Sequence, residues 1–291
     1  MSETINFRSE VDFEGLPVKV FNRHKIDAFG GYLNWHKEIE MIYLKSGSCK
    51  TFIDGTLYTL EPGDIAVASS NMMHHRQWFY GDCSFSVIQM NPDWFVYPSE
   101  NAQQSDMEDI CSLKKCFDVL IRDPKMEELV LDVLKAWEKR TASPSLGIRL
   151  IAKSCLLYAH MIDFHCHKIG SDSAAARSDS RYVKDAILYI NSHFSEPISL
   201  SDIAGQMDIS PSYLSYIFSL NTGITASGYI NEVRVQNAAT LMKKGISVTE
   251  AAFASGFNST SYFAKIFKKI KKVSPSHLCQ KQPPDAPASK S

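Results

Sequence analysis

Two stretches near the end of the chain decide the fold: ISLSDIAGQMDISPSYLSYIFSLNTG at residues 198–223 and SVTEAAFASGFNSTSYFAKIFKKIKKVSPSHL at residues 247–278. Each starts with a serine that can cap a short helix, passes through a turn, and continues into a second helix with its own serine cap. Ser247 is followed three residues later by Glu250, the spacing of a capping box. A long helix over residues 227–244 joins the two stretches. The pattern therefore predicts two helix-turn-helix units.

The second helix of each unit divides into an apolar face and a small, polar or basic face. The expected buried residues are Tyr213, Leu214, Ile217 and Phe218 in the first unit and Tyr262, Phe263, Ile266 and Phe267 in the second. The expected outer residues are Ser212, Ser215 and Tyr216 on the first helix and Thr260, Ser261, Lys265, Lys268, Lys269 and Lys271 on the second. Two such faces suit two successive turns of a DNA groove.

Charge is divided unevenly along a chain whose net charge is only -1. Residues 1–180 contain 19 Lys and Arg against 25 Asp and Glu, a net of -6. Residues 181–282 contain 11 against 6, a net of +5. A basic C-terminal part favours a polyanionic partner. Ordinary scatter of surface charge can also produce +5, so the helix pattern carries more weight.

Three segments carry a family resemblance: Ser210-Pro211-Ser212-Tyr213-Leu214-Ser215, GFNSTSYFAKIFKK at residues 256–269, and Val273-Ser274-Pro275. They resemble the DNA-binding domain of the AraC/XylS family of bacterial transcription regulators. The resemblance implies base contacts from Ser212, Ser215, Tyr216, Thr260, Ser261 and Lys265. It implies phosphate contacts from Lys268, Lys269, Lys271 and the helix ends capped by Ser199 and Ser247. The two helices would enter major grooves roughly 10 base pairs apart.

The chain departs from that family at two places. The family often has arginine where Tyr216 stands, so a bidentate contact to guanine is lost there. Tyr216 can instead stack on a sugar or touch a thymine methyl group. The family often has Thr-Gly where Lys271-Lys272 stands, which affects the helix end and leaves the fold expectation intact.

The first half of the chain consists of short apolar runs separated by turn residues. Strands are predicted at residues 41–44, 49–53, 56–60, 64–68 and 84–89. Asp54-Gly55 predicts a hairpin with a type I′ turn, because both residues tolerate a positive φ. Short antiparallel strands at this spacing predict an all-β barrel.

Part of this region has the spacing of known metal-binding motifs. Asn34-Trp35-His36, Glu40 and Gly47 match the first motif of the cupin family, and Gly55 with Pro62-Gly63 is similar to the start of the second. The resemblance implies a cupin-like barrel. Asn34 and Ala66 stand where two of the metal ligands would be, and a catalytic metal needs about three protein ligands. We therefore expect no metal, no cofactor and no catalytic residues.

A barrel of this size can instead hold a small effector. The candidate effector-binding residues are Trp35, His36, Glu40, His74, Arg76 and Trp78. Each has a simpler interpretation: the aromatic residues pack in the core, and His36 forms a hydrogen-bonded pair with Glu40. A remnant metal site formed by the histidines and Glu40 is a third alternative.

Helices are predicted between the barrel and the helix-turn-helix units, over residues 106–121, 124–140 and 146–167. The last is apolar on more than one face, which favours either a sandwiched position or a dimer contact. Residues 170–180 are small and polar, as in a flexible linker. The predicted domains are a cupin-like effector-binding and dimerisation domain (1–168), a linker (169–180), a DNA-binding domain (181–282) and a flexible tail (283–291).

The remaining features place the chain in the cytoplasm. The 7 cysteines include no Cys-x-x-Cys pair, which favours free thiols in a reducing compartment. The N-terminus has no apolar segment typical of a signal peptide. The longest apolar run, over residues 146–164, is interrupted by Arg149, Lys153 and Asp163, so no membrane span is expected.

These observations predict a two-domain transcription regulator that is not an enzyme. Its expected partners are double-stranded DNA, a small-molecule effector such as a sugar or related metabolite, and a second copy of the chain, with RNA polymerase as a further candidate. One alternative is a metal-dependent cupin enzyme with an appended DNA-binding module. The other is a ligand-independent regulator whose barrel only dimerises.

Overall fold

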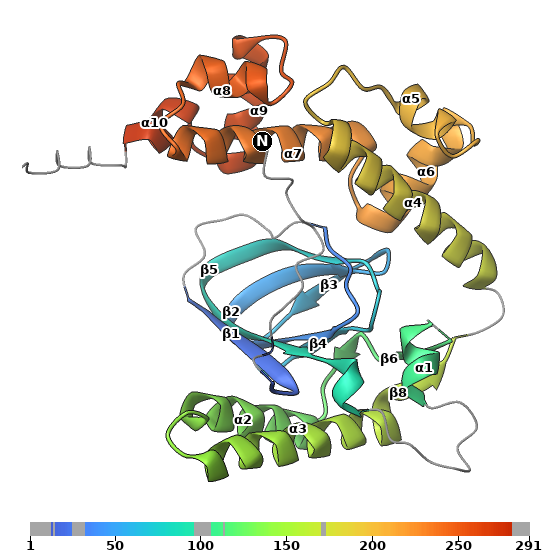
Figure 1. Cartoon of the computed structure of the whole chain (residues 1–291), viewed down its shortest axis with the longest axis vertical. Coiled ribbons are helices and arrows are strands. Elements are labelled where there is room, and N and C mark those ends of the chain that lie inside the picture. Colours follow the sequence, from blue (N-terminus) through green and yellow to red (C-terminus); the bar gives the residue numbers. More distant parts are fainter. Residues whose placement is uncertain are drawn as a thin grey trace, which may run out of the picture. The chain divides into compact units, whose positions relative to one another are not determined.

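The computed structural model describes residues 13, 15–24, 33–95, 106–112, 114–169 and 173–280. Within these ranges, the side chains of residues 24, 76–81, 106–108, 173–178 and 278–280 lie outside the described part. The chain divides into two compact units, with the boundary between Ala176 and Arg177. Figure 1 shows the strands in the N-terminal unit and the helix-rich C-terminal unit.

An antiparallel sheet forms the centre of the N-terminal unit. It contains β1 (Val18–His24), β2 (Ile39–Ile53), β3 (Thr56–Leu60), β4 (Ile65–Ala68), β5 (His74–Met90) and β7 (Leu120–Ile121). The strand order is β1-β5-β2-β4-β7, and β3 pairs with β2. Among the described residues the path ends at β1 and β7, which do not pair with each other, so the strands form a sheet without showing a closed barrel.

Successive side chains of a strand point to opposite faces of the sheet. In this unit both faces are buried, each by its own core cluster. Met41 and Tyr43 of β2 lie in one core cluster with residues of the helices that follow the sheet. Ile42 and Leu44 lie in a second cluster on the other face. Burying each such aliphatic side chain contributes about 1.5–3 kcal/mol.

The predicted hairpin at Asp54-Gly55 is confirmed, since φ is 45° at Asp54 and 79° at Gly55 between the paired strands β2 and β3. The separate strands predicted at residues 41–44 and 49–53 are instead parts of β2, whose pairing with β5 shifts register around Gly47. A Cβ atom on Gly47 would lie 2.8 Å from Cys83 Cα, so glycine allows β5 to pass closely. β5 also begins ten residues before the predicted strand at 84–89.

Short elements follow β5. They are the 3₁₀ helix η1 (Pro92–Phe95), α1 (Asp106–Cys111), β6 (Lys115–Phe117) and β8 (Cys166–Lys168), and β6 pairs with β8. The helix predicted over residues 106–121 is therefore wrong beyond Cys111. Leu120 and Ile121 form β7 on the open edge of β4, where backbone pairing outweighs local helical spacing.

Helices α2 (Pro124–Lys139) and α3 (Pro144–His165) lie along one face of the sheet (Figure 1). Asp123 caps α2 and Pro124 occupies its first turn, as expected. Of the helices within the described residues, α3 alone is long and apolar enough to cross a membrane. Leu150, Leu157 and Met161 of α3 are fully buried in the core with α2 and the sheet, so one face of α3 belongs to the core of this unit.

The C-terminal unit is helical. It contains α4 (Ser173–His193), α5 (Leu200–Gly205), α6 (Pro211–Thr222), α7 (Ala226–Lys243), α8 (Val248–Ala254), α9 (Thr260–Lys271) and α10 (Pro275–Gln280). α4 begins inside residues 169–180, so the predicted irregular linker is wrong from Ser173 onward. The three alanines at 174–176 are strong helix formers and extend α4 toward its N-terminus.

Candidate nucleic-acid interface

The first helix-turn-helix unit consists of α5, a tight turn and α6. Ser199 caps α5 in a capping box with Asp202. The turn closes when the Ile209 amide donates to the Ala204 carbonyl at 3.2 Å, with Asp208 at a φ of 54°. Ser210 then caps α6 by accepting from the Tyr213 amide at 3.2 Å.

The second unit repeats this geometry with α8 and α9. Ser247 forms a capping box with Glu250, the Phe257 amide donates to the Ala252 carbonyl at 3.1 Å, and Ser259 accepts from the Tyr262 amide at 3.3 Å. Gly256 takes the left-handed turn position with a φ of 86°. A Cβ there would lie 2.6 Å from the Phe194 carbonyl oxygen, so only glycine fits.

The outer face of α6 carries the predicted contact residues. Ser212 is exposed, Ser215 is half-buried, and Tyr216 is 64% exposed. The burial predicted for Tyr213 is wrong, because its side chain is 40% exposed. Its hydroxyl donates to the Asp179 carboxylate of α4, and its ring meets Tyr182 edge-on at 6.5 Å. Tyr213 therefore packs against α4 at the surface and does not join the buried residues of α6.

The outer face of α9 is polar and basic. The exposed residues predicted as contacts are Thr260, Ser261, Lys265, Lys268 and Lys269. Tyr262, predicted to be buried, is 48% exposed and accepts a hydrogen bond from Asn231 Nδ2 at 3.3 Å. Phe263 and Phe267 are fully buried, as expected.

Lys271 differs from the other lysines of α9. Its ammonium donates a hydrogen bond to Gln236 Oε1 on α7, and its side chain is half-buried. Burial lowers the pKa of Lys271 below its usual value. Lys271 therefore links α9 to α7, a position unlike the exposed one predicted for a phosphate contact.

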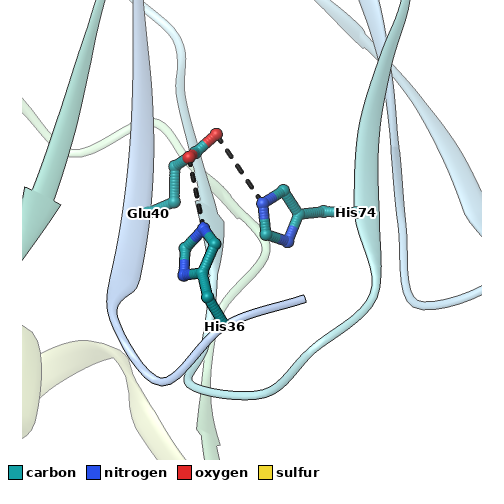
Figure 2. A group of neighbouring side chains, drawn as sticks. All are labelled: His36, Glu40 and His74. Atoms are coloured by element: carbon teal, nitrogen blue, oxygen red, sulfur yellow. Dashed lines mark ion pairs between the residues drawn. The ribbon is translucent and has the colours of Figure 1, made fainter. Parts of the chain in front are cut away.

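In the N-terminal unit, three candidate effector residues meet at one point (Figure 2). His36 Nε2 lies 3.5 Å from Glu40 Oε2, and His74 Nε2 lies 3.8 Å from Glu40 Oε1. The rings of His36 and His74 are edge-on at 4.9 Å, and all three residues are buried. Burial lowers the pKa of His36, but hydrogen bonds to Glu38 and Glu40 outweigh that effect and raise it to about 9.

The structure shows less about the other effector candidates. Trp35 is buried at 8% exposure beside His36 in the chain. The side chains of Arg76 and Trp78 lie outside the part of the chain that the structure describes. Ala66, at the expected position of a cupin ligand, lies in the apolar cluster with Ile42 and Leu44.

A second group of acidic residues and histidines lies where α3 ends. Asp123 Oδ2 lies 2.6 Å from His160 Nε2 and 3.2 Å from His165 Nε2. His165 Nδ1 also lies 3.1 Å from Asp118 Oδ2. The histidine nitrogens facing Asp123 are therefore engaged in hydrogen bonds that fasten the end of α3 to the N-terminus of α2.

Comparison with known proteins agrees with the helical geometry. Residues 203–281 match a family model described as a helix-turn-helix domain. The chain is 28% identical to the uncharacterized regulator YijO of Escherichia coli over 228 residues, 77% of this chain and 76% of that protein. It is 25% identical to the arabinose operon regulatory protein of Salmonella typhimurium over 239 residues, 77% of each chain.

The C-terminal helix-turn-helix domain of this chain is of the AraC type. A solved structure of ToxT from Vibrio cholerae is similar over 90% of this chain and 94% of that chain, with 16% identity and a TM-score of 0.45. The match to the helix-turn-helix model and to named regulators makes this a DNA-binding transcription regulator, whose C-terminal unit carries the helix-turn-helix pair.

Two supporting residues of the AraC-type domain were not predicted from the sequence. Arg234 on α7 donates from Nε to the Phe194 carbonyl at 2.7 Å and from Nη2 to the Glu196 carbonyl at 2.9 Å. Asn237 donates to Ser255 Oγ at 3.0 Å beside the second turn. The sequence shows that these polar residues lie in a long helix, but it does not show their hydrogen-bond partners. Their supporting role therefore could not be predicted.

Proposed function

We propose that this AraC-family regulator places α6 and α9 in neighbouring major grooves of its operator. The observation that carries the proposal is the repeated geometry of the two units, which leaves one polar helix face exposed in each. Base contacts come from Ser212, Ser215 and Tyr216 on α6 and from Thr260, Ser261 and Lys265 on α9.

The two helices divide the work unequally. α6 reads PSYLSYIFSLNT and contains no charged residue, whereas α9 carries exposed Lys265, Lys268 and Lys269. Because lysines that neutralise phosphates supply the salt-dependent part of DNA affinity, α9 provides most of the electrostatic attraction. α6 contributes contacts through hydroxyl groups and the exposed ring of Tyr216.

The N-termini of α5 and α8 are less suited to phosphate than the lysines. Each capping box places a carboxylate at the helix end: Asp202 in α5 and Glu250 in α8. These carboxylates accept hydrogen bonds from the Ser199 and Ser247 amides at 2.8 and 3.3 Å and would repel a phosphate. We assign the phosphate contacts to Lys268 and Lys269.

The N-terminal unit senses a small molecule. His36, Glu40 and His74 bring polar groups together in the sheet region, and buried Trp35 adjoins His36 in the chain, which supports a ligand site. Arg76 and Trp78 belong to the same proposal on sequence grounds. Binding must favour one arrangement of the DNA-binding units over another, since equal binding to both would change nothing.

The chain acts as a homodimer through α3. Ile148, Leu156 and Phe164 on α3 are 66%, 60% and 69% exposed, a large apolar surface for a helix whose other face is in the core. Leu156→Glu is expected to shift the sedimentation coefficient from dimer to monomer. Leu188→Glu on α4, where the leucine is 50% exposed, is the matched control and should leave the dimer intact.

Selection of bound DNA from a random pool, with and without a metabolite extract, tests this function. Recovery of one sequence with two recognition segments about 10 base pairs apart supports the two-groove arrangement. A change in affinity with extract supports an effector, whereas identical binding favours a ligand-independent regulator. Absence of any enriched sequence contradicts the DNA assignment. Turnover of a substrate by purified metal-loaded protein would revive the enzyme alternative.

A further inference from the structure

The two histidine rings of the N-terminal cluster have the same orientation relative to the backbone. His36 Nδ1 lies 3.0 Å from the Glu38 carbonyl oxygen, and His74 Nδ1 lies 2.9 Å from the Met72 carbonyl oxygen. A carbonyl oxygen only accepts hydrogen bonds, so Nδ1 carries a hydrogen in each ring. Metal-binding histidines commonly use such a second bond to fix the ring and direct the other nitrogen at the ion.

The Nε2 atoms that remain on His36 and His74 are buried, and each faces the Glu40 carboxylate, at 3.5 and 3.8 Å, without a well-formed hydrogen bond. Among the described residues, Asn34 Oδ1 and Gln89 Oε1, close by in the fold, are likewise buried without a well-formed hydrogen bond. Asn34 pairs through its backbone with His74, and Gln89 donates from Nε2 to Glu40 Oε2 at 2.9 Å. Buried polar atoms without well-formed hydrogen bonds are destabilising, so several of them together favour a site that binds an ion.

The spacing of the donor atoms suits a metal ion. One ligand atom from each of His36, Glu40 and His74 lies within 4.8 Å of the other two. The two nitrogen–oxygen distances are 3.5 and 3.8 Å, and ligands bound at about 2.1 Å in a tetrahedron lie about 3.4 Å apart. For these two distances the contraction needed is a few tenths of an ångström.

We propose that His36, Glu40 and His74 bind a divalent first-row transition-metal ion through the two Nε2 atoms and the Glu40 carboxylate. Two imidazoles and a carboxylate suit zinc, iron, nickel or cobalt, in contrast to magnesium and calcium, which prefer oxygen ligands. Three protein ligands leave at least one coordination position open. His74 supplies the third ligand from the start of β5, which compensates for Asn34 and Ala66 in the motif positions.

The inference refines the proposed effector site and rests on it for any regulatory consequence. The ion would hold together the start of β2 and the start of β5, and its open position could receive an anionic or polar small molecule. Metal binding and DNA binding are measured in separate experiments. A chain that binds no metal can therefore still bind DNA as proposed, and the reverse also holds.

The test uses the full-length chain, stripped with a chelator and dialysed against Zn²⁺ alone. We expect about one zinc ion per chain by elemental analysis and a rise in the unfolding midpoint with zinc concentration. Cobalt in place of zinc should give visible absorption bands typical of nitrogen and oxygen ligands. A wild-type chain that retains no zinc above the buffer level overturns the proposal.

Three variants and two controls locate the site. His36→Gln, Glu40→Gln and His74→Gln should each weaken zinc binding by roughly tenfold or more. His75→Gln is the matched control: His75 is the next residue on β5, and its ring packs on Phe52 at 5.4 Å. His160→Gln tests the cluster around Asp123. Unchanged zinc affinity in all three site variants, or loss in the His160→Gln chain alone, contradicts the assignment.

Because a site variant can also disturb folding, each is checked by specific DNA binding and by tryptophan fluorescence. All 4 tryptophans lie in the N-terminal unit, so their emission reports that unit alone. A variant with wild-type emission and no zinc supports the metal site. Wild-type zinc binding accompanied by a lower unfolding midpoint would show that the cluster is an ordinary buried ion pair.

Discussion

Arg234 Nε donates a hydrogen bond of 2.7 Å to the carbonyl oxygen of Phe194, forty residues earlier in the chain. The same carbonyl would lie 2.6 Å from a Cβ atom on Gly256. The end of α4, the middle of α7 and the turn of the second helix-turn-helix unit therefore meet at one carbonyl group. The position of α9 depends on this meeting point, because its N-terminal cap follows Gly256 by three residues.

Gly256→Ala should destabilise the C-terminal unit by about 1–3 kcal/mol, since it combines a positive φ with a backbone clash. Loss of helical circular dichroism on heating measures the effect, while the tryptophan transition of the N-terminal unit should stay unchanged. Gly205→Ala is the control: no atom lies within 4 Å of its added Cβ, and it should be neutral or more stable by up to about 1 kcal/mol. Equal midpoints for the two variants would contradict the clash.

Lys268→Ala should weaken binding to all DNA sequences and lower the slope of log affinity against log salt by about one. Affinity measured over a range of salt concentrations gives the slope. Lys271→Met is the comparison on the same helix. Because Lys271 bonds Gln236, its replacement should lower stability with less effect on the slope. An unchanged slope for Lys268→Ala would show that this side chain contacts no phosphate.

Thr260→Ala should relax preference at one base position, with a loss of about 1–3 kcal/mol of discrimination there. Binding to a set of single-base operator variants measures the preference. Thr240→Ala on α7 is the control, since its hydroxyl donates to the Gln236 carbonyl within the same helix. Equal weakening on every operator variant would remove Thr260 from the base contacts.

Asp123→Asn should destabilise the N-terminal unit at neutral pH by about 1–3 kcal/mol. His160, the Lys125 amide and His165 hold the pKa of Asp123 well below its usual range. A depressed carboxyl pKa stabilises the fold above the unfolded value, roughly pH 4, and the contribution is lost as pH falls through the folded value.

Urea unfolding followed by tryptophan fluorescence, at neutral pH and in acid, measures that change. The difference between wild type and Asp123→Asn should shrink in acid. Asp132→Asn is the control, because its pair with Lys153 is 41% and 34% exposed and contributes less than about 1 kcal/mol. A constant difference at every pH would mean that Asp123 acts only as a neutral cap.

The features predicted correctly from the sequence depend on neighbours within a few residues. Ser199, Ser210, Ser247 and Ser259 all cap helices, as local spacing indicated. A capped helix start requires only a side chain and an amide two or three residues later. Local chemistry therefore predicted the helix-turn-helix pair before any tertiary contact was known.

Three of the errors involve partners distant in the chain. Tyr213 lies at the surface against Asp179 and Tyr182 of α4 instead of in the core, and Lys271 turns inward toward Gln236. Residues 112–121 have helical spacing, yet part of them extends the sheet beside β4. His74 joins His36 only through the pairing of distant strands, which a motif of fixed spacing does not contain.

Helix α7 also sets the rotation of α9 relative to α6, the two helices proposed to contact DNA. Its 18 residues span about 27 Å, and each residue turns the following segment by about 100°. One inserted residue would rotate α9 away from the groove that α6 selects, whereas an insertion of a whole turn would come close to restoring the angle. If α6 and α9 bind as proposed, the distance between the two operator contacts is set by the length of a helix that need not touch a base.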